Sequence, residues 1–314
     1  MASVRAEAPA IALEGVAKRY GTVEAVSDVS FALPQGGRVA LVGHNGAGKT
    51  TLMKLMLGLA RPSAGRILVL GRDPAEGAAE TRRRIGWLTE NVTFNGALTG
   101  REVLRFFARL KGEPASAADA MLERVGLADA ARRRVGTYSK GMRQRLGLAQ
   151  ALIGAPRALL LDEPTTGLDP EVRQGLYDIL AALSGAGTTV LLSSHALEEL
   201  EGRVERVVIL DRGRLVADGA MPELRRLARL PLRLRLTLAE VGAAPPEWLD
   251  SAGQLRRLGA DVVELACAPE EKMALLRRAA DDARIADIEL QAPTLDELYA
   301  HFLRGHGQRR EGAT

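Results

Sequence analysis

Short apolar runs alternate with longer stretches of helical periodicity along most of the chain. The runs Ala158–Asp162 and Thr188–Ser193 are almost wholly apolar, which is typical of strands buried on both faces of a sheet. The stretches Lys49–Leu59 and Ser139–Ile153 repeat apolar residues every three or four positions, which predicts helices. Strands separated by helices in this way predict an α/β fold whose parallel sheet is covered on both faces.

The remaining elements follow from the same two periodicities. We expect further strands at Ala10–Gly15, Ser27–Leu33, Arg38–Val42, Arg66–Leu70, Ile85–Leu88, Arg206–Asp211 and Arg214–Asp218. We expect further helices at Arg101–Lys111, Ala115–Val125, Pro170–Leu183, Ala196–Glu201 and Met221–Leu230. The early strands resemble hairpins, so an antiparallel sheet is expected beside the parallel one.

The pattern starts again after Pro231. The later elements are expected to be strands at Leu232–Leu238, Asp261–Ala266 and Ile285–Leu290, and helices at Glu270–Ala283 and Thr294–Leu303. Thr294 and Glu297 have the spacing of a capping box at the start of the last helix. We therefore expect a domain at residues 1–230, a small accessory α+β domain at 231–304 and a disordered tail at 305–314.

Composition narrows the class of protein. The chain has 314 residues, of which 46% are hydrophobic and 26% are charged, as in an ordinary globular protein. No apolar run approaches the roughly 20 residues of a membrane helix, and the N-terminal segment lacks the apolar stretch of a signal peptide. We expect a cytoplasmic protein, so a role at the membrane would come through a partner.

Cysteine, histidine and the basic residues exclude other classes. Cys267 is the single cysteine, so no disulfide is expected within the chain. The histidines form no metal-ligand cluster in the sequence and stand at His44, His195, His301 and His306. The net charge is +4, and the basic clusters Arg82–Arg84 and Arg132–Arg134 contain no aromatic residues. We interpret these clusters as solvated helix faces and expect no nucleic-acid partner.

A glycine-rich segment carries the strongest chemical signal. Residues 43–50 read G-H-N-G-A-G-K-T and fit the phosphate-loop pattern, between an apolar strand and a helix as the motif requires. Its glycines allow the backbone to approach phosphate closely, and the helix N-terminus adds partial positive charge. We expect Lys49 to reach the β- and γ-phosphates of a nucleoside triphosphate, Thr50 to bind Mg²⁺ and Thr51 to bind the α-phosphate.

Two adjacent carboxylates end the apolar run Ala158–Leu161. In P-loop ATPases a strand of this kind delivers an aspartate to the Mg²⁺ shell, a role that fits Asp162. Glu163 points to the other side of the strand end, where it would orient and deprotonate an attacking water. Taken alone, paired acids at a strand end are equally compatible with a capping or solubilising role.

Further segments resemble those of ABC transporter ATPases, in the same order. Residues 138–144 (Y-S-K-G-M-R-Q) resemble the signature sequence of that family, residues 166–169 (T-G-L-D) resemble its D-loop, and His195 resembles its switch histidine. The resemblance covers residues 10–230. It implies the P-loop NTPase fold of the ABC ATPase type, with a mixed sheet, an antiparallel subdomain and a helical subdomain at about 91–155.

The resemblance implies Mg²⁺-dependent hydrolysis of ATP to ADP and phosphate. It assigns catalysis to Glu163 and His195, and metal binding to Thr50, Glu90 and Asp162. It assigns nucleotide binding to Tyr20, Gly43, His44, Asn45, Gly46, Ala47, Gly48, Lys49, Thr50, Thr51, Ser139, Lys140, Gly141 and Asp169. Tyr20 would stack on adenine. Ser139 would cap a helix that faces the γ-phosphate held by a second copy, so that two ATP molecules lie buried between the copies.

Three positions depart from the family pattern. Glu90 stands where members often carry glutamine, and it would add a negative charge near the γ-phosphate while still able to bind Mg²⁺. Lys140 and Met142 replace glycine and glutamine in the signature. Lys140 would either touch ribose or phosphate or remain exposed.

A narrower resemblance is to NosF, the ATPase subunit of the NosDFY transporter that matures the copper sites of nitrous oxide reductase. The resemblance rests on residues 87–94, 107–112, 137–152 and 291–299. It implies a NosY-like membrane permease and, indirectly, a NosD-like periplasmic subunit as partners, with this chain at the inner face of the cell membrane. The chain would supply energy without carrying copper.

Two other functions stay open at this point. The chain would also fit an exporter of drugs, lipids or polysaccharides, in which the C-terminal domain serves a different partner. A soluble ABC ATPase that acts on nucleic acid or ribosomes is the other alternative. Such relatives usually carry two ATPase modules in one chain, whereas this chain has one.

Overall fold

The computed structural model describes residues 8–76, 79–250 and 252–311. The chain divides into two compact units, Met1–Gly219 and Ala220–Thr314. The expected boundary at residue 230 placed the helix Met221–Leu230 in the N-terminal domain. The structure has this helix as α7 (Met221–Ala228) in the second unit, where the Arg225 side chain donates a hydrogen bond to the Pro293 carbonyl (2.9 Å).

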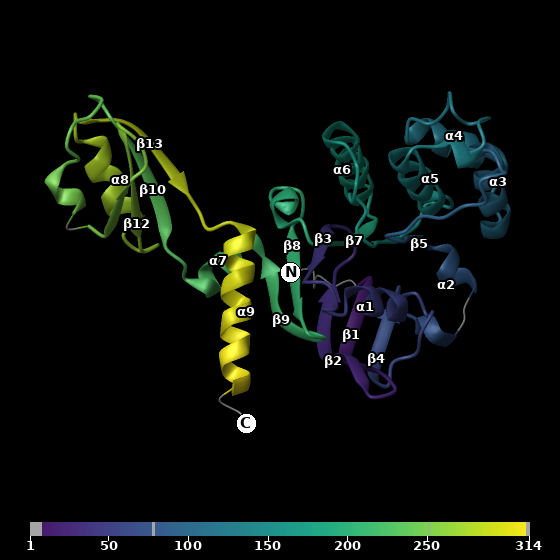
Figure 1. The fold of residues 1–314 in the computed structure, drawn as a ribbon. Coiled ribbons are helices and arrows are strands. Elements are labelled where there is room, and N and C mark those ends of the chain that lie inside the picture. The colour runs from purple at the N-terminus through teal and green to yellow at the C-terminus, as the bar shows by residue number, and fades with distance from the viewer. Residues whose placement is uncertain (1–7, 77–78, 251, 312–314) are drawn as a thin grey trace, which may run out of the picture. The chain divides into compact units, whose positions relative to one another are not determined.

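A six-stranded sheet forms the centre of the first unit (Figure 1). Its strands, in spatial order, are β5 (Ile85–Leu88), β6 (Ala158–Leu161), β7 (Thr189–Ser194), β3 (Arg38–Val42), β8 (Arg206–Asp211) and β9 (Arg214–Ala220). The first five of these run parallel, as the apolar runs predict. All residues of β6 and β7 are buried, which explains why their sequences lack polar alternation.

A three-stranded antiparallel sheet lies beside it, made of β2 (Val23–Leu33), β1 (Ile11–Tyr20) and β4 (Ala64–Val69). The hairpin of β1 and β2 extends further than its apolar pattern predicts, since its outer end is polar and largely exposed. Helix α1 (Lys49–Met56) packs on these strands, and its apolar residues are fully buried in the core that the two sheets share.

Three helices form the helical subdomain expected at about 91–155: α3 (Gly100–Lys111), α4 (Ser116–Arg124) and α5 (Lys140–Leu152) (Figure 1). Thr99 and Glu102 form a complete capping box at the start of α3. Two further helices are α2 (Ala79–Arg83), which the sequence pattern missed, and α6 (Pro170–Gly185). The helix expected at Ala196–Glu201 is one 3₁₀ turn, Leu197–Leu200.

The second unit has its own antiparallel sheet, in the order β11 (Gln254–Arg257), β12 (Val262–Cys267), β10 (Leu232–Leu238) and β13 (Ile285–Gln291). Helix α8 (Lys272–Ala280) packs on this sheet, and together they enclose a separate apolar core. Strand β11 was not expected, because three of its four residues are polar and exposed at the sheet edge.

The last helix, α9, runs from Leu295 to Glu311 (Figure 1). Thr294 and Glu297 form the predicted capping interactions at its start, with Thr294 N–H to Glu297 Oε2 at 2.9 Å. The expectation of a disordered tail at 305–314 is wrong as far as Glu311. Gly305 and Gly307 lower helix propensity by about 1 kcal/mol each, but no proline blocks the helical hydrogen bonds there. Residues 312–314 lie outside the described part of the chain.

Candidate functional site

The phosphate loop connects the end of β3 to the start of α1. Two of its glycines have no room for a side chain. A Cβ atom at Gly48 would lie 2.7 Å from the Ala25 carbonyl oxygen, and Gly48 has φ 101°, in the region that favours glycine. A Cβ atom at Gly43 would lie 2.6 Å from the Leu210 carbonyl oxygen. These close contacts with the neighbouring strands therefore hold the loop in the conformation that the motif requires.

The loop borders a cavity of about 640 Å³. The cavity is lined by Val23, Glu24, Ala25, His44, Asn45, Gly46, Ala47, Gly48, Lys49, Thr50, Thr51, Glu90, Asp162, Glu163, His195 and Arg212. Residues far apart in the sequence meet here because the parallel strands β3, β6 and β7 end at the same edge of the sheet. Crevices at the carboxyl ends of parallel strands are the usual ligand sites of α/β folds.

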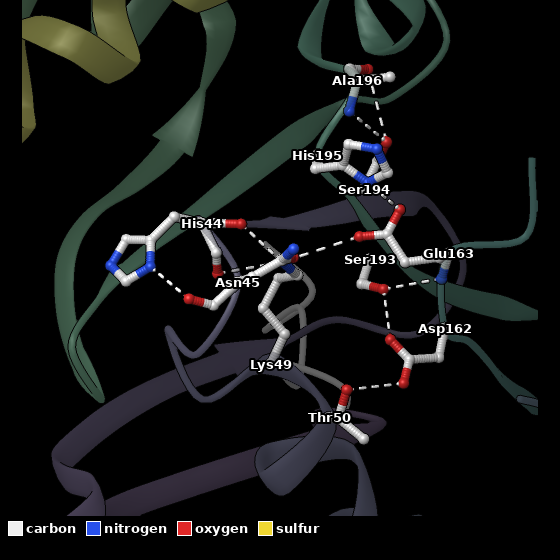
Figure 2. A network of polar contacts seen from close by, with 11 residues as sticks. His44, Asn45, Lys49, Thr50, Asp162, Glu163, Ser193, Ser194, His195 and Ala196 are labelled. Atoms are coloured by element: carbon white, nitrogen blue, oxygen red, sulfur yellow. Dashed lines mark hydrogen bonds and ion pairs between the residues drawn. The ribbon is translucent and has the colours of Figure 1, made fainter. Parts of the chain in front are cut away.

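Lys49 is the central cation of the cavity (Figure 2). Its side chain is only 7% exposed, and its ammonium donates to the carbonyl oxygens of Gly43 (2.6 Å) and His44 (3.4 Å). The Lys49 Nζ atom also lies 3.7 Å from Glu163 Oε1. The ammonium therefore sits between the loop and the carboxylates.

Both oxygens of Asp162 are held by hydroxyl groups (Figure 2). Thr50 Oγ1 donates to Asp162 Oδ2 at 2.8 Å, and Ser193 Oγ donates to Asp162 Oδ1 at 2.6 Å. The Ser193 oxygen in turn accepts from the backbone N–H of Glu163 at 2.8 Å. These bonds join the first turn of α1 to the ends of β6 and β7, and they fix the position of the aspartate.

Glu163 is buried and asymmetrically bonded. His195 Nδ1 lies 2.7 Å from Glu163 Oε2, whereas Glu163 Oε1 is buried without a hydrogen-bond partner in the structure and faces Lys49 (Figure 2). Glu163 also has φ 49°, an uncommon value for a residue with a side chain. Such conformations persist where the surrounding structure enforces them, and they concentrate at functional sites.

Six of the residues expected to bind nucleotide do not line this cavity: Tyr20, Gly43, Ser139, Lys140, Gly141 and Asp169. Tyr20 ends β1 and is half exposed, with the Lys18 ammonium 4.9 Å from its ring centroid. Asp169 precedes α6. Gly43 belongs to the phosphate loop itself, and the other five lie outside the cavity lining of their own chain.

Ser139 is the N-cap of α5, as expected, and its Oγ accepts from the Met142 N–H at 3.2 Å. The Lys140 side chain lies over Gly167, since a Cβ atom there would be 2.4 Å from Lys140 Nζ. Gly141 approaches the Leu168 side chain. The start of α5 and the segment after Glu163 therefore pack against each other.

The sequence matches a known family. The ABC transporter family description matches residues 26–166. A daunorubicin resistance ATP-binding protein, DrrA3 of Streptomyces coeruleorubidus, is 38% identical over 315 residues, which cover 97% of this chain and 99% of the relative. The chain belongs to the ABC transporter ATP-binding proteins. It is therefore an ATP-hydrolysing subunit, and members of this family use Mg²⁺, dimerise and pair with a membrane permease.

Other relatives of this ABC ATPase include a doxorubicin resistance ATP-binding protein, DrrA of Mycobacterium tuberculosis, which is 36% identical and covered to 92% in both chains. The Nod factor export ATP-binding protein I of Burkholderia orbicola is 41% identical over 67% of this chain and 70% of the relative. Within the part of the chain that the structure describes, no helix is both long and apolar enough to cross a membrane.

Solved structures agree with the fold. The ATP-binding subunit of an ABC transporter superposes with a TM-score of 0.65 at 30% identity, over 69% of this chain and 92% of that chain. A bacterial ABC transporter cassette solved as a dimer gives a TM-score of 0.63 at 24% identity, over 67% and 98%. These results confirm the expected P-loop NTPase fold of the ABC ATPase type.

The oxygen atoms at the foot of the loop fit Mg²⁺, which prefers hard oxygen ligands. Thr50 supplies a hydroxyl and Asp162 a carboxylate, already 2.8 Å apart, and Glu90 lines the same cavity. Among the described residues, no group of three or more histidine, cysteine or acidic residues could hold a metal by itself. A site of this kind is completed by the phosphate oxygens of the nucleotide.

Sequence reasoning missed two residues of this ABC ATPase site. Ser193 is fully buried and bonds both acidic residues at the end of β6. Gln144 on α5 is also buried, and its amide donates to the Pro164 carbonyl at 3.0 Å, directly after Glu163. The polar Ser193 at the end of an apolar strand was the available signal for the first, but nothing in the local sequence of Gln144 indicates its partner.

Proposed function

We propose that this chain is the ATPase subunit of an exporter of drug-like amphiphilic compounds. The observation that supports this most is the extent of similarity to the drug-resistance proteins. That similarity runs over 92–97% of the chain and so includes the second unit, whereas similarity to the Nod factor export protein covers 67%. A particular transporter would need this accessory unit, and this chain shares the unit with proteins named for drug resistance.

The competing assignment is that the chain powers a copper-site assembly transporter of the NosDFY type. It rests on the motif resemblance to NosF and would require NosY-like and NosD-like partners. The relatives described above are drug-resistance and Nod factor export proteins, and they favour export. In both assignments the chain acts from the cytoplasmic face of the membrane through its permease.

The roles of the cavity residues follow from their positions. Lys49, Thr51 and the backbone N–H groups of the loop bind the phosphates, and Glu163 orients and deprotonates the attacking water through its unbonded Oε1. His195 holds the other carboxylate oxygen and contacts the γ-phosphate. Magnesium, when bound at Thr50, Asp162 and Glu90, neutralises phosphate charge.

A second copy of the chain completes the site. Ser139, Lys140, Gly141 and Asp169 lie away from the cavity of their own chain, and we assign them to the nucleotide held by the partner copy. The free N–H groups at the start of α5 suit a phosphate group there. Tyr20 is assigned to the adenine, because its neighbour in the hairpin, Val23, lines the cavity.

An aromatic patch on the helical subdomain is the proposed contact for the permease. The ring of Phe107 packs edge to face on Phe106 (centroids 5.4 Å apart) and on Phe94 (6.3 Å). Phe106 is 49% exposed. Leu110, one turn after Phe106 on α3, is 59% exposed. Exposed aromatic and aliphatic side chains grouped in this way mark protein interaction sites.

The export proposal is tested by drug accumulation. The chain and its permease are expressed together in a drug-sensitive bacterium, and retention of a fluorescent anthracycline is measured against the same pair carrying Glu163→Gln. Lower retention with the unaltered pair only is expected. Equal retention in both strains, together with a nitrous oxide reductase that lacks its copper sites when the gene is deleted, would replace export with copper-site assembly.

The permease contact is tested by Phe106→Asp. A charge in the patch should abolish stimulation of ATP hydrolysis by the reconstituted permease while basal hydrolysis persists. Met273→Asp is the matched control, because Met273 is a similarly exposed apolar residue (54%) on α8 of the second unit. Stimulation that survives Phe106→Asp would remove the patch from the proposed interface.

A further inference from the structure

One arginine joins the D-loop (residues 166–169) to the turn that follows His195. Arg173 lies in the first turn of α6, and its Nη2 group donates to the Leu168 carbonyl oxygen at 3.1 Å. Its Nη1 group forms an ion pair with Glu199 Oε1. The two side chains are 29% and 21% exposed, so water screens the attraction only in part. A single planar guanidinium therefore holds two segments that lie far apart in the sequence.

The D-loop end of this bridge fixes the peptide directly before Asp169. Because a peptide unit is planar, a bond that holds the Leu168 carbonyl also sets the direction in which the chain enters Asp169. Asp169 is exposed at the N-cap of α6, but its carboxylate makes no capping bond to the described residues of that helix. Aspartate at this position usually caps its own helix. The Asp169 carboxylate is thus placed by Arg173 and is available to a group outside the helix.

The other end of the bridge follows the position of His195. The Glu199 N–H donates to the Ala196 carbonyl at 3.3 Å, and the Ala196 N–H donates to Ser194 Oγ at 3.0 Å. Figure 2 shows Ala196 and Ser194 on either side of His195 along the chain. Both leucines of the 3₁₀ turn that contains Glu199 are buried, so close packing opposes a change in the shape of the turn. A displacement of His195 is therefore expected to carry Glu199 with it.

A second side chain on the same face of α6 holds the same segment. Tyr177 is buried one helical turn after Arg173, and the Arg203 guanidinium lies 4.4 Å from the centroid of its ring. Burial and the neighbouring Glu199 carboxylate raise the pKa of Tyr177 to about 12. The segment from Glu199 to Arg203 is thus attached to α6 at two points.

We propose that Arg173 is a positioning residue that couples the two ATP sites of the dimer. His195 contacts the γ-phosphate of the ATP in its own chain, and Asp169 serves the ATP of the partner copy. The γ-phosphate sets the position of His195, the turn carries Glu199, and Arg173 then places Asp169 at the other site. Coupling of this kind passes through contiguous contacts. The inference rests on the roles of His195 and Asp169 in the proposed function.

The experiment measures ATP hydrolysis against ATP concentration, with the chain assembled on its permease. Two coupled sites give a Hill coefficient between about 1 and about 2. Arg173→Ala should lower it to about 1 and reduce kcat about tenfold, the effect of one charge-assisted hydrogen bond. The Kd of ATP should stay nearly unchanged, because Arg173 lies outside the cavity lining. A Hill coefficient of about 1 in the unaltered complex, or an unchanged one in Arg173→Ala, would overturn the proposal.

Glu199→Gln tests the other half of the bridge. It should lower the Hill coefficient as Arg173→Ala does, and the double variant should lose no more than either single variant, because one pair carries the effect. Glu198→Gln is the matched control, since Glu198 is the exposed acid that directly precedes Glu199 in the same turn. It should keep both the Hill coefficient and kcat. Additive losses in the double variant, or an equal loss in Glu198→Gln, would count against the bridge.

Arg173→Lys separates the geometry of the bridge from its charge. Lysine keeps the positive charge but presents one ammonium on a flexible stem, whereas the arginine fork holds two acceptors in a fixed geometry. We expect the melting temperature to stay near that of the unaltered chain while the Hill coefficient falls to about 1. Full cooperativity in Arg173→Lys would show that charge alone is needed and would refute the positioning role.

Dimerisation by ATP separates this inference from the proposed function on which it rests. Glu163→Gln and the double variant Glu163→Gln/Arg173→Ala are sedimented with and without ATP. Both should dimerise with ATP, because Arg173 places Asp169 and is not itself assigned to the nucleotide. Absence of a dimer in both would remove the two-copy site and the inference together. Dimers in both, with unchanged cooperativity of hydrolysis in Arg173→Ala, would remove the inference and leave the two-copy site standing.

Discussion

At the scale of single residues, the carboxylate of Glu163 has one oxygen held by His195 and one buried without a hydrogen-bond partner. Glu163→Gln keeps the shape and most of the contacts but replaces the base with an amide. We expect turnover to fall by about 10²–10⁴ while ATP still binds, the usual contribution of a general base. Phosphate release and the Kd of ATP measure the two effects separately.

The control for this substitution is Glu198→Gln. Glu198 is an exposed acid in the 3₁₀ turn that follows His195, so its replacement removes a nearby charge without touching the cavity. Turnover close to normal in Glu163→Gln, or an equal loss in Glu198→Gln, would exclude Glu163 as the base.

Residues of the site differ in how far the sequence reveals them. The phosphate loop, Asp162 and Glu163 are recognisable because they lie in short contiguous segments whose residue types indicate their chemistry. Ser193 bonds a partner 31 positions away, and His44 bonds one 167 positions away. Such pairs arise from the order of strands in the sheet, which periodicity alone does not specify.

At the scale of elements, the last residue of α3 ties the helical subdomain to the main sheet. The Lys111 ammonium donates to the Ile153 carbonyl (2.7 Å) after α5 and to the Ile85 carbonyl (3.4 Å) in β5. Burial lowers the pKa of Lys111 from 10.5 to about 8. Between these two values the unfolded chain binds more protons than the folded chain, so the unfolding free energy gains a rising contribution with pH.

Lys111→Met should remove that rise. Denaturant melts at several pH values between about 8 and about 10 measure it as a flatter dependence of the unfolding free energy on pH in the variant. Lys54→Met replaces an exposed lysine on α1 and should keep the slope of the unaltered chain. Parallel curves for the unaltered chain and Lys111→Met would contradict the lowered pKa of the Lys111 ammonium.

Elements with a strong apolar period were predicted well, and those without one were not. Strands β5 and β8 begin and end as expected, because their apolar residues are mostly buried. Strand β11 and helix α2 are short and mostly polar, and their positions depend on neighbours that lie elsewhere in the sequence. The end of α9 was missed because the last residues of the chain were interpreted as a disordered terminus, although no proline interrupts the helix before Glu311.

At the scale of the whole molecule, the two units have separate apolar cores that share no residue. A chain that ends at Gly219 should therefore keep the nucleotide fold and bind ATP as the full chain does. A chain that ends at residue 230 should be less soluble. It retains α7 without α9, the helix against which α7 packs, and exposes the apolar face that includes Leu224 and Ala228. Calorimetric ATP titrations and sedimentation of the two truncated chains measure this, and loss of ATP binding in the shorter one would refute it.

Separate cores also predict how the full chain melts. Each unit should unfold in its own transition, and ATP should stabilise only the unit that contains the phosphate loop, because a ligand stabilises the folded state that binds it. At a hundredfold excess over Kd the gain is about 2.7 kcal/mol, enough to move one transition by several degrees. Differential scanning calorimetry with and without ATP, repeated with Lys49→Ala, resolves the two. A single transition that moves as a whole with ATP would mean that the units fold as one cooperative body.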